Sequence, residues 1–136
     1  MLKRLAPALL LALAAPLPAP AQQLDYEARG RDLVMLSRIF GELHHIRRLC
    51  QAWGEEEVWR NRMRKLVELE SPQPQLRGQM ITAFNDSFRA AERRFAYCDR
   101  DARDYAAATA AEGDAVTARL SAPLYDSLAA GGAVPR

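Results

Sequence analysis

The sequence predicts an all-α fold, a small four-helix bundle-like domain with one disulfide, preceded by a cleavable signal peptide. Apolar residues recur every three or four positions along most of the chain, which is the period of an amphipathic helix. β-Branched residues are few and nowhere alternate with polar ones over the length of a strand. We expect three parts: a signal peptide at 1–21, a helical domain at 22–128 and a flexible C-terminal tail at 129–136.

The first 21 residues have the layout of a secretory leader. Lys3 and Arg4 form a positive start, the apolar stretch is Leu5–Ala15, and a small-residue cleavage site ends at Ala21. The apolar stretch is too short to cross a bilayer as a stable helix. We therefore expect a periplasmic or secreted protein with no stable membrane insertion after cleavage.

The charge balance argues against nucleic acid as a partner. The full chain has 19 basic and 17 acidic residues. Cleavage removes Lys3 and Arg4 and no acidic residue, which leaves 17 of each sign. A chain without net charge has no general attraction for polyanions or for an anionic membrane surface.

The chain has two cysteines, Cys50 and Cys98. In an exported protein, an even number of well-separated cysteines favours a disulfide. Closing a loop of this length stabilises the folded state by roughly 4 kcal/mol in the chain-entropy treatment. The alternative is a pair of unlinked buried thiols. A metal site needs further ligands at suitable spacing, and we expect none.

The first predicted helix spans residues 25–51 and ends before Trp53-Gly54, because glycine favours the left-handed cap conformation. Its apolar stripe consists of Leu33, Leu36, Phe40, Leu43, Ile46, Leu49 and Cys50. The second predicted helix begins near Glu55 with three glutamates in its first turn, where the helix dipole favours acids. It ends before Pro72, because proline disfavours helical geometry in the preceding residue. Its apolar face consists of Val58, Trp59, Met63, Leu66 and Val67.

The third predicted helix spans residues 75–97, and Asp99 is the expected N-cap of a fourth helix that reaches Ser121. The apolar side of the third helix consists of Leu76, Met80, Ile81, Phe84, Phe88, Ala91 and Phe95. The fourth helix is rich in alanine, which has a high helix propensity but buries little area. Pro123 should stop or kink it, with a short turn over 124–128.

Short connections between the predicted helices favour antiparallel neighbours. The first and third helices then run in the same direction. Cys50 ends the first helix and Cys98 follows the third, so both cysteines lie at one end of the bundle. This agreement between the topology and the disulfide supports the predicted fold.

The sequence offers no catalytic set, no metal site and no cofactor-binding motif. Glu42 and His45 have the i, i+3 spacing of a di-iron ligand pair, but the complete site needs a second such pair. With two histidines in the chain, adjacent at 44 and 45, it cannot be built. No glycine-rich phosphate loop or glycine-flanked nucleophilic serine is present in the sequence.

Two further features of the sequence are candidates for a structural or ligand-binding role. Gly41 costs about 1 kcal/mol in a helix interior relative to alanine, and with Ser37 it forms a small face that lets another helix approach closely. A polar cluster lies beside the predicted core, either as a structural hydrogen-bond network or as the lining of a ligand pocket. Its members are Glu42, His44, Arg47, Trp59, Arg60 and Asn85.

Several motifs resemble an uncharacterised alphaproteobacterial family of small secreted or periplasmic helical proteins. They are Leu36-Ser37-Arg38-Ile39-Phe40-Gly41-Glu42-Leu43-His44, Arg47-Arg48-Leu49-Cys50, Trp59-Arg60 with Met63, Glu70 before Pro72, Phe84-Asn85 and Cys98. The likeness covers about residues 33–120. It implies export and a role for the Cys50–Cys98 pair, and it implies no activity, because the family is a domain of unknown function.

These observations favour a non-enzymatic periplasmic binding or protein-interaction module. The expected partner is an unknown envelope protein or a second copy of the chain, with the alanine-rich fourth helix as one shared face. The alternative is a small cell-envelope enzyme acting on cell-wall glycan, with Glu42 as its acid.

Overall fold

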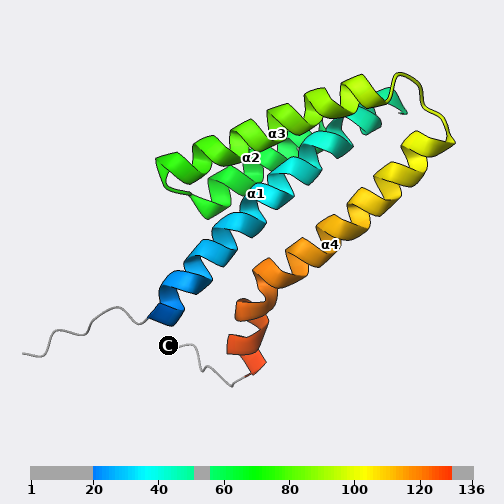
Figure 1. The fold of residues 1–136 in the computed structure, drawn as a ribbon. Helices are drawn as coiled ribbons and strands as arrows, with labels where there is room; N and C mark the ends of the chain where they lie inside the picture. Colours follow the sequence, from blue (N-terminus) through cyan, green and yellow to red (C-terminus); the bar gives the residue numbers. More distant parts are fainter. Residues whose placement is uncertain (1–19, 51–55, 130–136) are drawn as a thin grey trace, which may run out of the picture.

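The computed structural model describes residues 20–50 and 56–129, and this part of the chain contains four helices (Figure 1). They are α1 (Pro20–Leu49), α2 (Val58–Glu70), α3 (Pro74–Arg94) and α4 (Arg100–Ala129). The described residues include no strand. The predicted all-α, bundle-like fold is confirmed.

The ends of the helices differ from the predicted ones by three residues or more at four places. α1 begins at Pro20 and not at residue 25. α2 begins at Val58, so Glu57 precedes the helix instead of occupying its first turn. α3 ends at Arg94 and not at residue 97, because Phe95 takes an extended conformation and is buried at the α1–α4 contact. α4 continues through Pro123 to Ala129, so the predicted end at residue 121 is wrong. Residues 1–19 of the predicted leader, the Trp53-Gly54 break and residues 130–136 lie outside the described residues.

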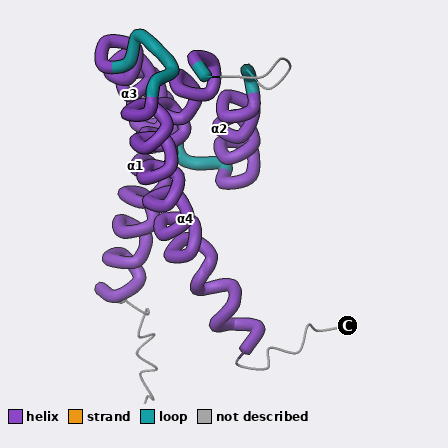
Figure 2. The backbone as a smooth tube through the Cα atoms, turned by 90° about the vertical axis from the view of Figure 1, so that its right-hand side faces the viewer, coloured by secondary structure: helices purple, strands orange, loops and turns teal. Residues whose placement is uncertain are grey.

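Helix α1 is the centre of the domain, and the other three helices pack against it. α1 and α3 run in the same direction, while α2 and α4 run back the opposite way (Figure 1). Figure 2 shows that the lower end of α4 leaves the side of α1. The contact between α1 and α3 is the most extensive of the three.

The buried core lies along α1 between Leu33 and Ile46 in three clusters. The first comprises Leu33, Met63, Met80 and Phe84; the second comprises Leu36, Ile39, Leu43 and Val116; the third comprises Ile46, Phe95 and Ala102. The first joins α1 to α2 and α3, and the other two join it to α4 and the α3–α4 connection. A helix with neighbours on several sides needs apolar residues on more than one face.

α1 and α3 approach each other closely at Gly41. The Ser87 hydroxyl, on α3, lies within hydrogen-bonding distance of the carbonyl oxygens of Arg38 (2.8 Å) and Phe84 (3.0 Å), and its single hydrogen can be donated to either. A Cβ atom at position 41 would lie 2.9 Å from the carbonyl carbon of Phe84 and would overlap its oxygen. The expectation that Gly41 permits a close helix approach is therefore confirmed.

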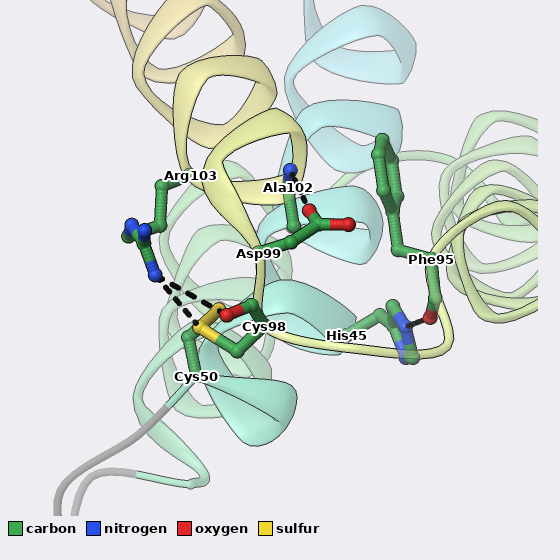
Figure 3. Close-up of a disulfide and its surroundings, with 7 residues drawn as sticks. All are labelled: His45, Cys50, Phe95, Cys98, Asp99, Ala102 and Arg103. Carbon is green, nitrogen blue, oxygen red and sulfur yellow. Dashed lines mark hydrogen bonds between the residues drawn. A yellow bond between two sulfur atoms is a disulfide. The ribbon is translucent and has the colours of Figure 1, made fainter.

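Cys50 and Cys98 form a disulfide with their Cα atoms 4.9 Å apart. Figure 3 shows the bond where the end of α1 meets the connection between α3 and α4. The Asp99 carboxylate accepts a hydrogen bond of 2.8 Å from the Ala102 amide, which confirms the predicted N-cap. The Nε2–H of His45 donates a hydrogen bond of 2.8 Å to the Phe95 carbonyl oxygen. This carbonyl group at the C-terminal end of α3 thereby has a hydrogen-bond partner. Both the pairing and its place at one end of two parallel helices are as predicted.

Candidate functional site

Glu42 lies on the side of α1 that faces α4. Its Oε1 atom accepts a hydrogen bond of 2.6 Å from Arg38, whose guanidinium also reaches Glu112 on α4 at 2.8 and 2.9 Å. Its Oε2 atom is buried and has no hydrogen-bond partner in the described part of the chain. Burial, and then the neighbouring Glu42 carboxylate, raise the pKa of Tyr105. The carboxylate of Glu42 thus belongs to an ionic contact between α1 and α4.

His44 lies on a different side of α1 and is buried against α3, with 1% of its surface exposed. Its ring centroid lies 5.7 Å from that of Phe84 and 5.3 Å from that of Phe88. Among the residues that the structure describes, neither ring nitrogen has a hydrogen-bond partner. Burial is the main cause that lowers the pKa of His44; the Glu57 carboxylate opposes it, and Arg60 and Arg48 lower the pKa further.

The stability of the fold should fall in mild acid because of His44. The ordinary histidine pKa is 6.5 and the folded chain lowers it, so below that pH the unfolded state binds a proton that the folded state excludes. This contribution to stability is complete above about pH 6.5 and is lost as the pH drops, by at most about 1.4 kcal/mol per pH unit. Urea unfolding of the wild type and of His44→Leu between pH 8 and pH 5 measures the difference. The His45→Gln variant should keep the acid loss, and parallel curves for wild type and His44→Leu would contradict the prediction.

The other four members of the predicted polar cluster do not converge on His44 and Glu42. Trp59 is half-buried against Phe40, with ring centroids 5.5 Å apart. Arg60 is exposed, 3.5 Å from Glu57, and lies close enough to His44 to affect its pKa. Arg47 and Asn85 are exposed. None of the six members of the cluster lines the grooves described below.

A long open groove lies between the first half of α1 and α3. It has a volume of about 1300 Å³ and extends along α1 from Tyr26 to Arg38 and along α3 from Gln75 to Ala90. Twelve steps of 1.5 Å along α1 give it a length of about 18 Å. Its apolar lining includes Val34, Met35, Leu76, Ala83 and Ala90. We call it the α1–α3 groove.

A smaller groove of about 260 Å³ continues from its end toward the turn between α2 and α3. The two share Tyr26, Gly30, Gln73 and Leu76 in their linings. Glu70 and Arg29 form an ion pair of 2.7 Å at the border of the smaller groove. At this end, an ion pair therefore borders the apolar surface of the two grooves.

The groove was not predicted from the sequence, although two sequence patterns indicate part of its lining. Gln75, Gln79, Ala83 and Ser87 follow one another at intervals of four and form an uncharged row on α3. Val34 and Met35 stand beside the main apolar stripe of α1. An uncharged row opposite a second apolar face predicts a surface between two helices.

Groups of three or more histidine, cysteine, aspartate or glutamate side chains that could hold a metal ion do not occur among the described residues. Within the same part of the chain, every helix is too short or too polar to cross a membrane. Fold and surface together define a small helical domain with one disulfide and an open apolar groove.

The chain belongs to the DUF2385 family of proteins of unknown function, which matches residues 26–123. The resemblance to a family of unknown function is thereby confirmed. Comparisons with curated proteins and with solved structures find no match.

Proposed function

We propose that the chain is an exported, non-enzymatic protein-interaction module that binds an amphipathic helix in the α1–α3 groove. The observation that carries the proposal is the groove itself, about 1300 Å³ of open and mostly apolar surface between two parallel helices. Contiguous exposed apolar surface in a small domain marks a site of interaction. An open trough of this size exceeds the volume of common small-molecule pockets and is not enclosed as they are.

The shape of the groove favours a helical ligand. A length of about 18 Å corresponds to roughly three turns of helix at 5.4 Å each. A helix that presents apolar residues at intervals of three and four can place them along Val34, Leu76 and Ala83. Glu27, Arg31 and Asp86 lie among the lining residues and supply a charged rim for the polar side of such a ligand.

Export is supported by two features of the chain. The first 21 residues have the order of a secretory leader, and Cys50 and Cys98 form a disulfide. Disulfides persist in oxidising compartments and are rare in the cytosol of most organisms. The periplasm of a bacterium is the compartment that fits both features.

The described residues offer no observation that favours the glycan-cleaving alternative. The Glu42 carboxylate would serve as the acid, but it is 8% exposed and ion-paired with Arg38 at 2.6 Å.

Site-specific photocross-linking in cells that export the full chain tests the proposed function. A photoreactive phenylalanine at Gln79, in the groove, should form a discrete adduct, whereas the same group at Glu92, an exposed position of α3 outside the groove, should not. Mass spectrometry should place the cross-link in an amphipathic helical segment of the partner. The substitution Ala83→Glu should remove the adduct, because it puts a charge into the apolar floor. Equal labelling at positions 79 and 92, or an adduct that survives Ala83→Glu, would refute the groove as the binding surface.

A further inference from the structure

We propose that the Cys50–Cys98 disulfide is an asymmetric site of thiol–disulfide exchange, in which an incoming thiolate bonds to Cys50 and Cys98 leaves as the thiolate. The two sulfur atoms belong to the end of one helix and to the approach to another (Figure 3). Both cysteines keep part of their surface exposed. The proposal concerns this end of the domain and does not depend on the helix-binding function of the α1–α3 groove.

The Cys98 sulfur atom lies where a negative charge is stabilised. The Nη1–H group of Arg103 points to this residue, 3.2 Å from its carbonyl oxygen and 3.8 Å from its Sγ atom. Cys98 also lies two residues before Arg100, the first residue of α4, and the N-terminal end of a helix dipole is positive. The Asp99 carboxylate faces the Ala102 amide at 2.8 Å. A guanidinium and a helix N-terminus are features that favour a cysteine thiolate.

The Cys50 sulfur atom belongs to the opposite kind of helix end. Cys50 follows the last residue of α1, and its amide donates a hydrogen bond of 2.8 Å to the Ile46 carbonyl oxygen. The last carbonyl groups of a helix carry a negative partial charge, which disfavours an anionic neighbour. Of the arginines in this turn, Arg48 has its guanidinium over the Phe88 ring, 5.8 Å from the ring centroid. Negative charge is therefore better accommodated on Cys98 than on Cys50.

The chain around Cys98 is held in place by contacts other than the disulfide. The Phe95 ring is buried in the core, and the Phe95 carbonyl oxygen accepts a hydrogen bond of 2.8 Å from His45 on α1. On the other side of Cys98, the Asp99 carboxylate caps α4. These contacts do not need the sulfur–sulfur bond, so a Cys98 thiolate stays beside Arg103 when the bond opens.

The exchange step replaces one sulfur–sulfur bond by another. The thiol loses its proton to solvent, and its sulfur atom forms a bond to the Sγ atom of Cys50. The bond between Cys50 and Cys98 breaks, and its electron pair stays on the Sγ atom of Cys98. A sulfur atom that accommodates negative charge more readily leaves faster, which sets the direction of the exchange. The co-reactant is a thiol of the exported compartment, and attack by Cys98 on the mixed disulfide closes the original bond again.

Trapping the product of exchange in the folded, oxidised full chain tests the proposal. The exported and purified chain is incubated with glutathione or, in a second arm, with a peptide that contains one cysteine. A rapid quench with excess alkylating agent follows, and mass spectrometry locates the added thiol and the alkyl group. The product with the thiol on Cys50 and the alkyl group on Cys98 should exceed the reverse product by about threefold or more. Reaction in both arms identifies protein and small-molecule thiols as co-reactants, and reaction with glutathione alone restricts the site to small thiols.

Two variants and one denatured sample provide the controls. Arg103→Gln removes the guanidinium beside Cys98 and should bring the product ratio closer to one. Arg100→Gln removes the same charge from the same turn of α4, but Arg100 lies 3.5 Å from Asp104, so the ratio should stay as in the wild type. In guanidinium chloride the ratio should fall to about one, because the helices and the Arg103 contact are lost. Equal products in the folded wild type, an excess of thiol on Cys98, equal ratios in the two variants, or no mixed disulfide with either thiol would overturn the proposal.

Discussion

Replacing Gly41 by alanine should destabilise the folded domain by about 3 kcal/mol, although alanine is the better helix former. The added methyl group would overlap the Phe84 carbonyl and the Ser87 hydroxyl at the α1–α3 crossing. Overpacking of a tight contact costs typically 1–3 kcal/mol and occasionally more, and a backbone carbonyl cannot rotate out of the way as a side chain can. The gain of 0.5–1 kcal/mol from helix propensity offsets only part of this cost.

Thermal unfolding followed by circular dichroism measures the effect. A loss of about 3 kcal/mol should lower the melting temperature by more than 10 °C in a domain of this size. The matched control is Gly78→Ala on α3, where an added Cβ has no atom within 4 Å, and it should raise the stability slightly. Adding Ser87→Gly to Gly41→Ala should not restore stability, because the Phe84 carbonyl still blocks the site. A Gly41→Ala protein as stable as the Gly78→Ala protein would show that α1 and α3 do not cross here.

Removing the disulfide should cost about 4 kcal/mol, which is a large part of the 5–15 kcal/mol that stabilises a typical domain. Cys50 and Cys98 are 48 residues apart, and the bond limits the freedom of that whole loop in the unfolded chain. The loop contains α2 and α3. The double variant Cys50→Ser/Cys98→Ser should therefore unfold at a much lower temperature than the oxidised wild type.

Two measurements check the effect. Mass spectrometry of non-reduced digests should show the peptides that contain Cys50 and Cys98 joined. Reduction of the wild type should reproduce the melting temperature of the double variant, which separates the loss of the bond from any effect of serine. Identical unfolding of the reduced and oxidised proteins would contradict the chain-entropy account of this bond.

The number of helices, the pairing of the cysteines and the special place of Gly41 could all be predicted, because each depends on local signals. Apolar spacing of three and four indicates helices, and Asp99 marks the start of α4 as an N-cap. The two cysteines occupy one end because short connections force neighbouring helices to alternate in direction. Gly41 could be predicted to lie at a close helix contact, because glycine destabilises a helix interior unless its lack of a side chain is needed for packing.

The predicted ends of α3 and α4 were wrong because tertiary contacts outweigh local propensity at those points. Phe95 leaves the helical conformation because its ring is buried beside Ile46 and Ala102. Pro123 does not end α4, although its ring fixes the local backbone and removes one hydrogen-bond donor.

The candidate site was harder to predict than the fold. His44 and Glu42 are two residues apart and looked like members of one cluster, but they point to different neighbours, α3 and α4. The groove residues Val34, Met35 and Ala83 resembled ordinary core or surface residues in the sequence. What distinguishes them is that no described helix covers the trough between them.

Residue spacing along the chain was sufficient to establish four helices, their alternation and the common position of the two sulfur atoms, because helix formation and short connections are local. The tertiary structure decided which faces of α1 are covered, that His44 is buried against two phenylalanine rings, and that the α1–α3 groove stays open. These outcomes depend on how surfaces from distant parts of the chain fit together, and one tight contact at Gly41 sets how closely α3 can lie along α1. That fit arises between pairs of helices and cannot be read from either helix by itself.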